Sequence, residues 1–222
     1  MNLGKIGIVV SARTASSRLP GKALLPLNQM PMILFLLNSL SEIERASLLL
    51  ATTNLASDDH LASIVKVAGY DVFRGNSQDL VQRYCDASRQ FGFDTIVRVT
   101  GDCPFVNAQL VEWCLDYAEQ TPCWDLVTTK GGFPIGLDVE IYPAKLMQKI
   151  LNQGCLTSFE REHLTLHLYN NEFVVECIPT PEGWFQTNKK FTVDTMEDYQ
   201  NAQKIFELLE KYNYSLKEML SH

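Results

Sequence analysis

Short apolar segments alternate with helix-like segments along the first half of the chain, and this alternation constrains the fold more than any other feature. The apolar segments are Ile6–Val10, Ser47–Thr52, Asp71–Phe73 and Thr95–Thr100. The segments with helical spacing are Met32–Ile43, a stretch from Ser57 to about Val67, Gln78–Phe91 and Ala108–Glu119. Strands that alternate with helices form parallel sheets with a helix layer on each face. The sequence therefore predicts an α/β fold with a mostly parallel sheet.

The pattern changes after about Thr121. Further strand-like segments, separated by Gly, Pro and Asn, are Asp125–Thr129, Leu137–Tyr142, Phe173–Ile178 and Phe191–Thr195. The remaining helical segments are Pro143–Asn152, a histidine-rich segment at Ser158–Tyr169 and a long amphipathic segment at Met196–Tyr212. We therefore expect one domain over residues 1–222, in which about 131–182 form an antiparallel addition to the sheet or an arm.

Composition excludes several classes of protein. Of 222 residues, 46% are hydrophobic and 20% charged, which suits a chain with a large core. The net charge of -7 argues against nucleic acid and anionic membranes as partners, because both require a basic face. The six cysteines contain no CxxC pair, which argues against a zinc ribbon and fits a reducing cytosol. The apolar runs are too short for a signal peptide or a membrane span, so we expect a cytoplasmic protein.

A loop of small residues with three cations follows the first strand. It reads SARTASSRLPGKALLPL over Ser11–Leu27, and its cations are Arg13, Arg18 and Lys22. A strand, such a loop and a helix form a recurring phosphate-binding arrangement, in which backbone N–H groups and basic side chains face the anion. The loop is not a P-loop, because GxxxxGK[ST] would require glycine at Ser16 and Ser or Thr at Ala23. A surface loop with incidental charges is the alternative.

Two aspartates follow strand-like segments that are far apart in the sequence. Asp102 lies in a turn directly after Thr95–Thr100, and Asp194 lies near the end of Phe191–Thr195. Ligands of open parallel sheets bind at the carboxyl ends of the strands. Because Mg²⁺ takes one or two carboxylates together with phosphate oxygens, we expect both aspartates to hold Mg²⁺ beside a polyphosphate. The alternative for Asp102 is a cap on the following helix.

Acids and histidines of the second half are further candidates. Asp138 and Glu140 alternate in GLDVEIY and should point to one face of a strand, either toward solvent or toward substrate hydroxyls or a second metal. His163 and His167 are four residues apart, but HExxH would require Glu at Leu164, which disfavours a zinc hydrolase. One histidine would bind substrate, or would be bonded to a carboxylate of the core.

Six motifs resemble, in their order, the SpsF-like group of the cytidylyltransferase family. They are ARTASSRLPGKALLPL, VFRGNSQDLVQRY, VRVTGDCPFV, IGLDVEIY, EREHLT and FTVDTMEDY, and the match covers about Ile6 to Ile205. The group is named for spore-coat polysaccharide biosynthesis, and its relatives include the CMP-sialate and CMP-Kdo synthetases. The resemblance implies a nucleotide-diphospho-sugar transferase fold: a three-layer α/β/α sandwich with a Rossmann-like mixed sheet and a small antiparallel arm that makes a homodimer.

The resemblance also implies a reaction: CTP and a sugar acid of the nonulosonic type give a CMP-sugar and pyrophosphate, with Mg²⁺ as cofactor. Its nucleotide site would comprise Ser11, Ala12, Arg13, Arg18, Lys22, Arg74, Gly75 and Asp102. Among these, the catalytic residues would be Arg13, Lys22 and Asp102. The metal ligands would be Asp102 and Asp194. The residues facing the sugar would be Asp138, Glu140 and His163.

Two positions depart from the usual pattern of this group. The loop usually reads ARMGSTRLPGK, so Thr14 and Ala15 replace Met and Gly, and Ala15 restricts a backbone position that glycine leaves free. The turn before Leu137 usually reads PDGLD, so Ile135 replaces an acid. Two alternatives follow: a nucleotidyltransferase that uses another nucleotide or acceptor, and a nucleotide-binding protein without catalysis.

Overall fold

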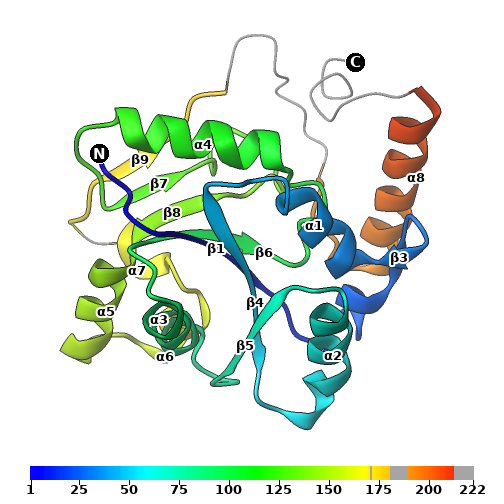
Figure 1. The fold of residues 1–222 in the computed structure, drawn as a ribbon, viewed down its shortest axis with the longest axis horizontal. Coiled ribbons are helices and arrows are strands. Elements are labelled where there is room, and N and C mark those ends of the chain that lie inside the picture. The colour runs from blue at the N-terminus through cyan, green and yellow to red at the C-terminus, as the bar shows by residue number, and fades with distance from the viewer. Residues whose placement is uncertain (171, 181–189, 213–222) are drawn as a thin grey trace.

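The computed structural model describes residues 1–170, 172–180 and 190–212. Within these ranges the chain forms a seven-stranded sheet in the order β5-β4-β1-β6-β8-β7-β9, and a separate two-stranded sheet, β2-β3 (Figure 1). The strands are β1 (Ile6–Ser11), β2 (Pro26–Leu27), β3 (Met30–Pro31), β4 (Ala46–Thr53), β5 (Asp71–Gly75), β6 (Thr95–Thr100), β7 (Leu126–Thr128), β8 (Glu140–Pro143) and β9 (Val175–Cys177).

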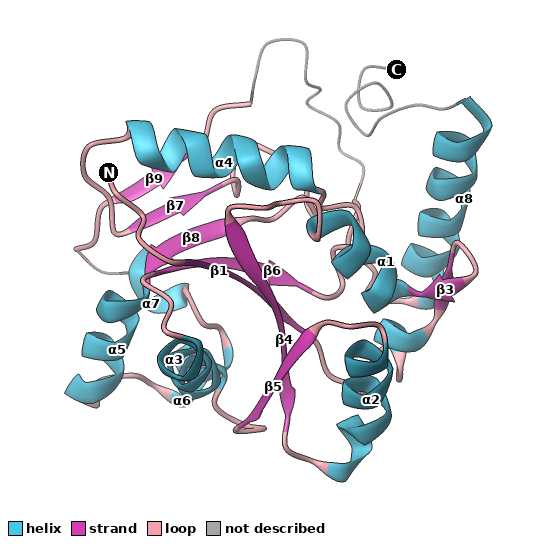
Figure 2. Cartoon of the chain, in the orientation of Figure 1, coloured by secondary structure: helices cyan, strands magenta, loops and turns pink. Residues whose placement is uncertain are grey.

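Helices lie on both faces of the large sheet (Figure 2). They are α1 (Met32–Leu40), α2 (Asp59–Val67), α3 (Leu80–Phe91), α4 (Ala108–Gln120), α5 (Ala144–Gln153), α6 (Ser158–Glu162), α7 (Leu166–Tyr169) and α8 (Met196–Tyr212), with 3-10 turns η1 (Lys22–Leu24) and η2 (Ala56–Asp58). No helix in these ranges is both long enough and apolar enough to cross a lipid bilayer.

The central strand β1 shows why the chain forms layers. It pairs in parallel with β4 on one side and with β6 on the other. Because side chains alternate along a strand, Ile8 and Val10 enter one hydrophobic core and Val9 enters the other. The first core contains side chains of α1, α2, α4 and α8, and the second contains side chains of α3, α5 and α7. The predicted three-layer α/β/α sandwich with a mixed, mostly parallel sheet is therefore confirmed.

The second half of the chain completes this sheet. Strand β8 pairs antiparallel with both β6 and β7, and β9 is parallel to β7. Of the two possibilities for residues 131–182, the structure thus shows an antiparallel addition to the sheet over the part that it describes. The predicted role of this region in dimerisation stays a prediction.

The prediction of a last strand at Phe191–Thr195 is wrong. Residues 191–194 have no regular secondary structure and make single backbone hydrogen bonds to two different loops. The N–H of Phe191 donates to the carbonyl of Ile135 (2.7 Å), and that of Val193 donates to the carbonyl of Asp102 (2.8 Å). These bonds fix the segment without a strand partner. Asp194 consequently reaches the carboxyl end of β6 from a loop.

Candidate active site

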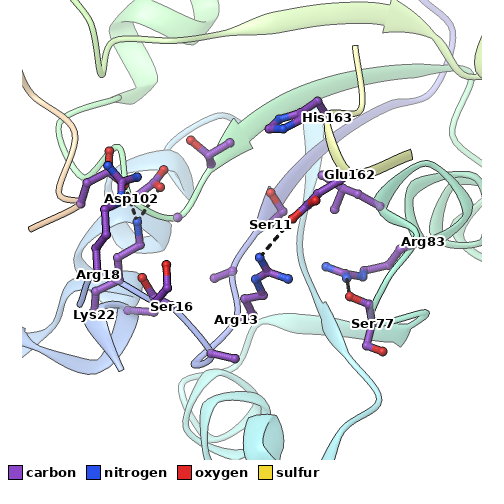
Figure 3. Close-up of a pocket in the computed structure, with 18 of the residues that line it drawn as sticks. Ser11, Arg13, Ser16, Arg18, Lys22, Ser77, Arg83, Asp102, Glu162 and His163 are labelled. Atoms are coloured by element: carbon purple, nitrogen blue, oxygen red, sulfur yellow. Dashed lines mark hydrogen bonds and ion pairs between the residues drawn. The ribbon is translucent and has the colours of Figure 1, made fainter. Parts of the chain in front are cut away.

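A cavity of about 530 Å³ lies where the carboxyl ends of β1 and β6 meet the loop after β1 (Figure 3). The end of β1, the loop after it and the start of η1 contribute Ser11, Ala12, Arg13, Ala15, Ser16, Ser17, Arg18, Lys22 and Ala23. The rest of the lining is Ser77, Gln78, Leu80, Arg83, Arg98, Thr100, Gly101, Asp102, Glu162, His163 and Asp194. The loop over Ser11–Leu27, which we call the cation loop, thus forms a wall of the cavity and is not a surface loop with incidental charges.

The cation loop is anchored at its apex. The backbone N–H and the Oγ1 of Thr14 both donate to Oδ1 of Asp58, at 2.7 and 2.6 Å. Asp58 is only 1% exposed and also accepts a hydrogen bond from Thr53. Burial raises the pKa of Asp58, but the hydrogen bonds from Thr14 and Thr53 outweigh it and lower the pKa overall. The carboxylate of Asp58 therefore fixes the conformation of the loop that contains the three cations.

Two backbone positions of the cation loop differ in the conformational freedom that they need: Gly21 adopts a positive φ, whereas Ala15 does not. Gly21 has a φ of 70°, which a glycine adopts at little cost, and its N–H donates to the carbonyl of Thr14 (2.9 Å). Lys22 starts the 3-10 turn directly after it. In the described part of the chain, the non-glycine residues with positive φ are Asn28 and Gln29, so Ala15 does not need the freedom of the glycine that it replaces.

Lys22 joins the two aspartates that the sequence analysis singled out. Its Nζ lies 2.7 Å from Oδ2 of Asp102 and 3.0 Å from Oδ1 of Asp194. Nη2 of Arg18 is 3.1 Å from the same oxygen of Asp194, and Lys190 lies 3.3 Å from its other oxygen. Burial raises the pKa of Asp194, yet Lys22 and Lys190 together lower it overall. Two carboxylates and three cations thus meet at one end of the cavity.

Backbone contacts explain why Asp102 lies here. The N–H of Gly101 donates to the carbonyl of Ser11 (2.8 Å), and a Cβ at Gly101 would lie 2.8 Å from that of Ala12. Glycine therefore lets the loop after β6 touch the end of β1. Asp102 does not cap α4, because Asn107 occupies the N-cap and its Oδ1 accepts from the N–H of Leu110 (2.9 Å).

The two aspartates fit the donor set of a magnesium site. Both carboxylates approach a single cation, the Nζ of Lys22, from two sides. No group of three or more His, Cys, Asp or Glu is gathered as a metal site among the described residues. A pair of carboxylates that needs further oxygens from phosphate and water is the usual protein contribution to Mg²⁺ binding.

The turn after β5 and the first helical turn of α3 contribute residues that sequence reasoning missed. Ser77, Gln78 and Arg83 line the cavity, and Arg83 is only 4% exposed. Its Nε and Nη2 donate to the carbonyl of Asn76 at 2.9 and 2.7 Å, and burial lowers its pKa. The signal in the sequence is an N-cap residue, Asp79, that places Arg83 one helical turn into α3.

The structure does not bring Arg74 and Gly75 to the cavity lining. Arg74 is 2.6 Å from a carboxylate oxygen of Asp59, and it donates to the carbonyls of Thr53 (3.0 Å) and Leu55 (2.8 Å). Its guanidinium is thus occupied by the edge of the sheet and the turn that leads into α2. Its neighbours in the sequence, Ser77 and Gln78, line the cavity in its place.

Asp138 and Glu140 also lie outside the lining of the main cavity. Strand β8 begins at Glu140, so Asp138 lies in the loop before it, where its Oδ2 accepts from the N–H of Gly136 (3.2 Å). Burial raises the pKa of Asp138. Glu140 is 1% exposed and contacts Arg98 and Lys130, so it does not face solvent or a sugar directly.

The two histidines have separate environments. His163 follows the last residue of α6 and lines the cavity, whereas His167 lies in α7. Nδ1 of His167 is 2.7 Å from Oε1 of Glu160, whose other oxygen accepts hydrogen bonds from Thr157. Because a break separates the two short helices, the spacing of four residues does not form a zinc pair.

Cys103 has no role as a nucleophile in this arrangement. Its side chain is buried, and both burial and the neighbouring charge of Asp102 raise its pKa. The thiolate, which is the reactive form, is therefore disfavoured. Cys103 is thus a small buried residue of the turn after β6.

Comparison with known proteins agrees with this architecture. The family model described as "Cytidylyltransferase" matches residues 7–222. The spore coat polysaccharide biosynthesis protein SpsF of Bacillus subtilis is 27% identical over 213 residues, which cover 92% of this chain and 88% of that protein. An 8-amino-3,8-dideoxy-manno-octulosonate cytidylyltransferase of Shewanella baltica is 30% identical over 224 aligned residues, with 90% and 89% covered.

A solved structure extends the likeness to three dimensions. A cytidylyltransferase from Leptospira borgpetersenii superposes with a TM-score of 0.84 at 30% sequence identity, over 94% of this chain and 95% of that one. The match to the family model spans almost the whole chain, including the cation loop and both aspartates. The protein therefore belongs to the cytidylyltransferase family, whose members are nucleotidyltransferases.

Proposed function

We propose that this protein transfers CMP from CTP to the anomeric hydroxyl of a sugar acid of the nonulosonic type and releases pyrophosphate, with Mg²⁺ as cofactor. The observation that carries this proposal is the contact of Lys22 with both Asp102 and Asp194 in the cavity that the cation loop lines. The names of the relatives support it, because one acts on an amino sugar acid and another takes part in polysaccharide biosynthesis.

The charges of the cavity suit a triphosphate. Arg13, Arg18 and Lys22 line one cavity and would neutralise the phosphates, while backbone groups of Ser11 and Ala12 would contact the base. Side-chain exposures of 50% for Arg13 and 63% for Arg18 leave both guanidinium groups accessible. Arg13 lies 3.6 Å from Glu162, a weak exposed ion pair that a phosphate can replace.

The reaction requires positioning and charge stabilisation more than a covalent catalyst. The anomeric oxygen attacks the α-phosphorus in line, the bond from that phosphorus to the bridging oxygen breaks, and pyrophosphate leaves with the bonding electrons. The proton of the hydroxyl passes to solvent. Asp102 and Asp194 would hold Mg²⁺, which when bound supplies positive charge at the phosphate oxygens. Arg13 and Lys22 would stabilise the charge that develops on the transferred and leaving groups.

The test is pyrophosphate release with CTP, UTP, GTP or ATP, with Mg²⁺ or with EDTA, against a panel of sugar acids that includes 3-deoxy-manno-octulosonate and N-acetylneuraminate. We expect release with CTP and one of the acids, and none with EDTA. Equal rates with UTP would move the proposal to a nucleotidyltransferase of broader specificity. A rise in melting temperature with CTP, but no release with any acid, would favour the nucleotide-binding protein without catalysis. The homodimer that the resemblance implies is a separate prediction, which sedimentation checks.

A further inference from the structure

A second cavity, of about 220 Å³, adjoins the first and shares two residues with it, Arg98 and His163. Its other lining residues include Lys130, Thr165 and Tyr169. Figure 3 shows His163 on a different side of the main cavity from Arg18 and Lys22. A ligand in the second cavity would therefore approach the nucleotide from the side away from the Lys22 end.

A buried carboxylate organises this second cavity. Glu140 forms an ion pair with Arg98, and its Oε1 accepts from Lys130 (2.9 Å), Thr165 (2.8 Å) and Tyr169 (2.7 Å). The side chain of Glu140 is 2% exposed, so this carboxylate is almost fully shielded from solvent. Burial raises the pKa of Glu140, but Arg98 and Lys130 outweigh burial and lower the pKa to about 2. Glu140 is therefore a fixed negative charge.

The charges of this network do not cancel. Among the groups that pair with one another at this cavity, Arg98 and Lys130 carry two positive charges against the single negative charge of Glu140. The carboxyl group of Asp138 also interacts with both cations, but it does not line the cavity, and burial raises its pKa, which disfavours its charged form. No acidic residue lines the second cavity among the residues that the structure describes. A cavity with one excess positive charge and a low-dielectric floor favours a ligand with one negative charge.

Both cations retain hydrogen-bonding capacity. Nε of Arg98 is buried and has no hydrogen-bond partner in the described ranges, and only Nη1 of this residue donates to Glu140. The side chain of Lys130 is 41% exposed, and its Nζ lies 5.6 Å from the centre of the Tyr169 ring. Lys130 is thus held over the cavity by a carboxylate and an aromatic face, and it has further donors available.

We propose that the second cavity binds the carboxylate of the acceptor through Lys130 and Arg98, and that Glu140 is the positioning residue that orients both cations. This inference rests on the proposed function, because the neighbouring cavity must hold the nucleotide. It assigns to Lys130 and Arg98 the contact that selects an acid over a neutral sugar. Glu140 acts through these cations and touches no substrate.

The experiment compares acids with their methyl esters, which differ by one negative charge. Saturation-transfer NMR is recorded on the full chain with 3-deoxy-manno-octulosonate, its 8-amino-3,8-dideoxy form and N-acetylneuraminate, each beside its ester and in the presence of CMP. We expect at least one acid to bind at least about tenfold more tightly than its ester, as one lost charge-assisted contact would produce. The substitution Lys130→Met should remove this preference, and Lys130→Arg should retain much of it. Lys149→Met, at an exposed lysine of α5, is the matched control.

The outcomes separate this inference from the proposed function. If Lys130→Met leaves the preference for the acid unchanged, or if none of the acids binds, the assignment of the second cavity is overturned. CTP binding and Mg²⁺-dependent pyrophosphate release are measured on the same samples, so loss of the proposed function appears there independently. Arg98 is tested after Lys130, because removal of a largely buried partner of Glu140 can unfold the protein.

Discussion

Two charge clusters at the two cavities have similar members and opposite properties. The Lys22 cluster consists of Lys22, Arg18, Lys190, Asp102 and Asp194, and its Lys22, Asp102 and Asp194 side chains are 15–28% exposed. The Glu140 cluster consists of Glu140, Arg98, Lys130, Thr165 and Tyr169 around a carboxylate that is 2% exposed. Ion pairs near solvent cost little to break, whereas removing one partner of a buried pair costs several kcal/mol. We therefore expect the first cluster to exchange partners with the phosphates of the proposed nucleotide, and the second to serve as a rigid support.

The largest expected effect tests the exchangeable cluster. Asp102→Asn should lower kcat by at least about 100-fold, because the variant would lose one of the two carboxylates proposed to hold the Mg²⁺ that offsets negative charge on the phosphates. The free energy of unfolding should change by less than about 1 kcal/mol, because the pair with Lys22 is partly solvated. Pyrophosphate release and urea denaturation measure the two quantities. Asp116→Asn, at an exposed aspartate of α4, is the control. Full activity of the Asp102→Asn variant would show that Asp102 does not belong to the active site.

In the Glu140 cluster, removal of the carboxylate should instead cause a large loss of stability. Glu140→Gln should reduce the free energy of unfolding by about 3 kcal/mol, because Arg98 loses its buried partner. Urea denaturation of this variant, beside the exposed control Glu207→Gln on α8, measures the loss. An unfolding free energy that matches the control would show that the Glu140 cluster is as exchangeable as the Lys22 cluster.

Acid titration should distinguish the clusters by a smaller margin. The pKa of Glu140 is lowered from 4.5 to about 2 in the folded protein, so its stabilisation is present above the unfolded pKa and is lost as the pH falls. Between pH 6 and pH 3 this group should contribute a loss of about 2 kcal/mol. The free energy of unfolding of Glu140→Gln should fall less steeply over this range. Parallel pH profiles for the variant and the natural chain would contradict the assigned pKa.

The smallest effect concerns the anchor of the cation loop. Thr14→Val removes the hydroxyl that donates to Asp58 but leaves the backbone hydrogen bond in place. We expect a loss of about 1 kcal/mol in stability and a modest rise in the KM for CTP. Thr14→Ser retains the hydroxyl and should restore both values. A variant with an unchanged melting temperature and KM would show that the loop needs no anchor at this point.

Local patterns predicted most of the scaffold. The alternation of apolar and helical segments located β1, β4, β5 and β6, and it indicated helices on both faces, because burial imposes a period on each element. The prediction was wrong at Phe191–Thr195, where the composition is typical of a strand but the segment pairs with no strand of the described ranges. The second cavity was not predicted, although Arg98, which lines it, is the one charged residue in the apolar segment TIVRVT.

The cation loop and the identity of the chemical groups were encoded locally, since a run of small and basic residues after a buried strand suits an anion wherever it folds. The partners of these groups depended on long-range packing. Lys22 contacts Asp102 and Asp194, which are 80 and 172 residues away, while Arg74 turns to Asp59 and Glu140 becomes buried under Arg98. Such contacts follow from strand order and from where loops cross at the end of a sheet. No periodicity within one segment contains that information, so the chemistry could be named from the chain but its geometry required the fold.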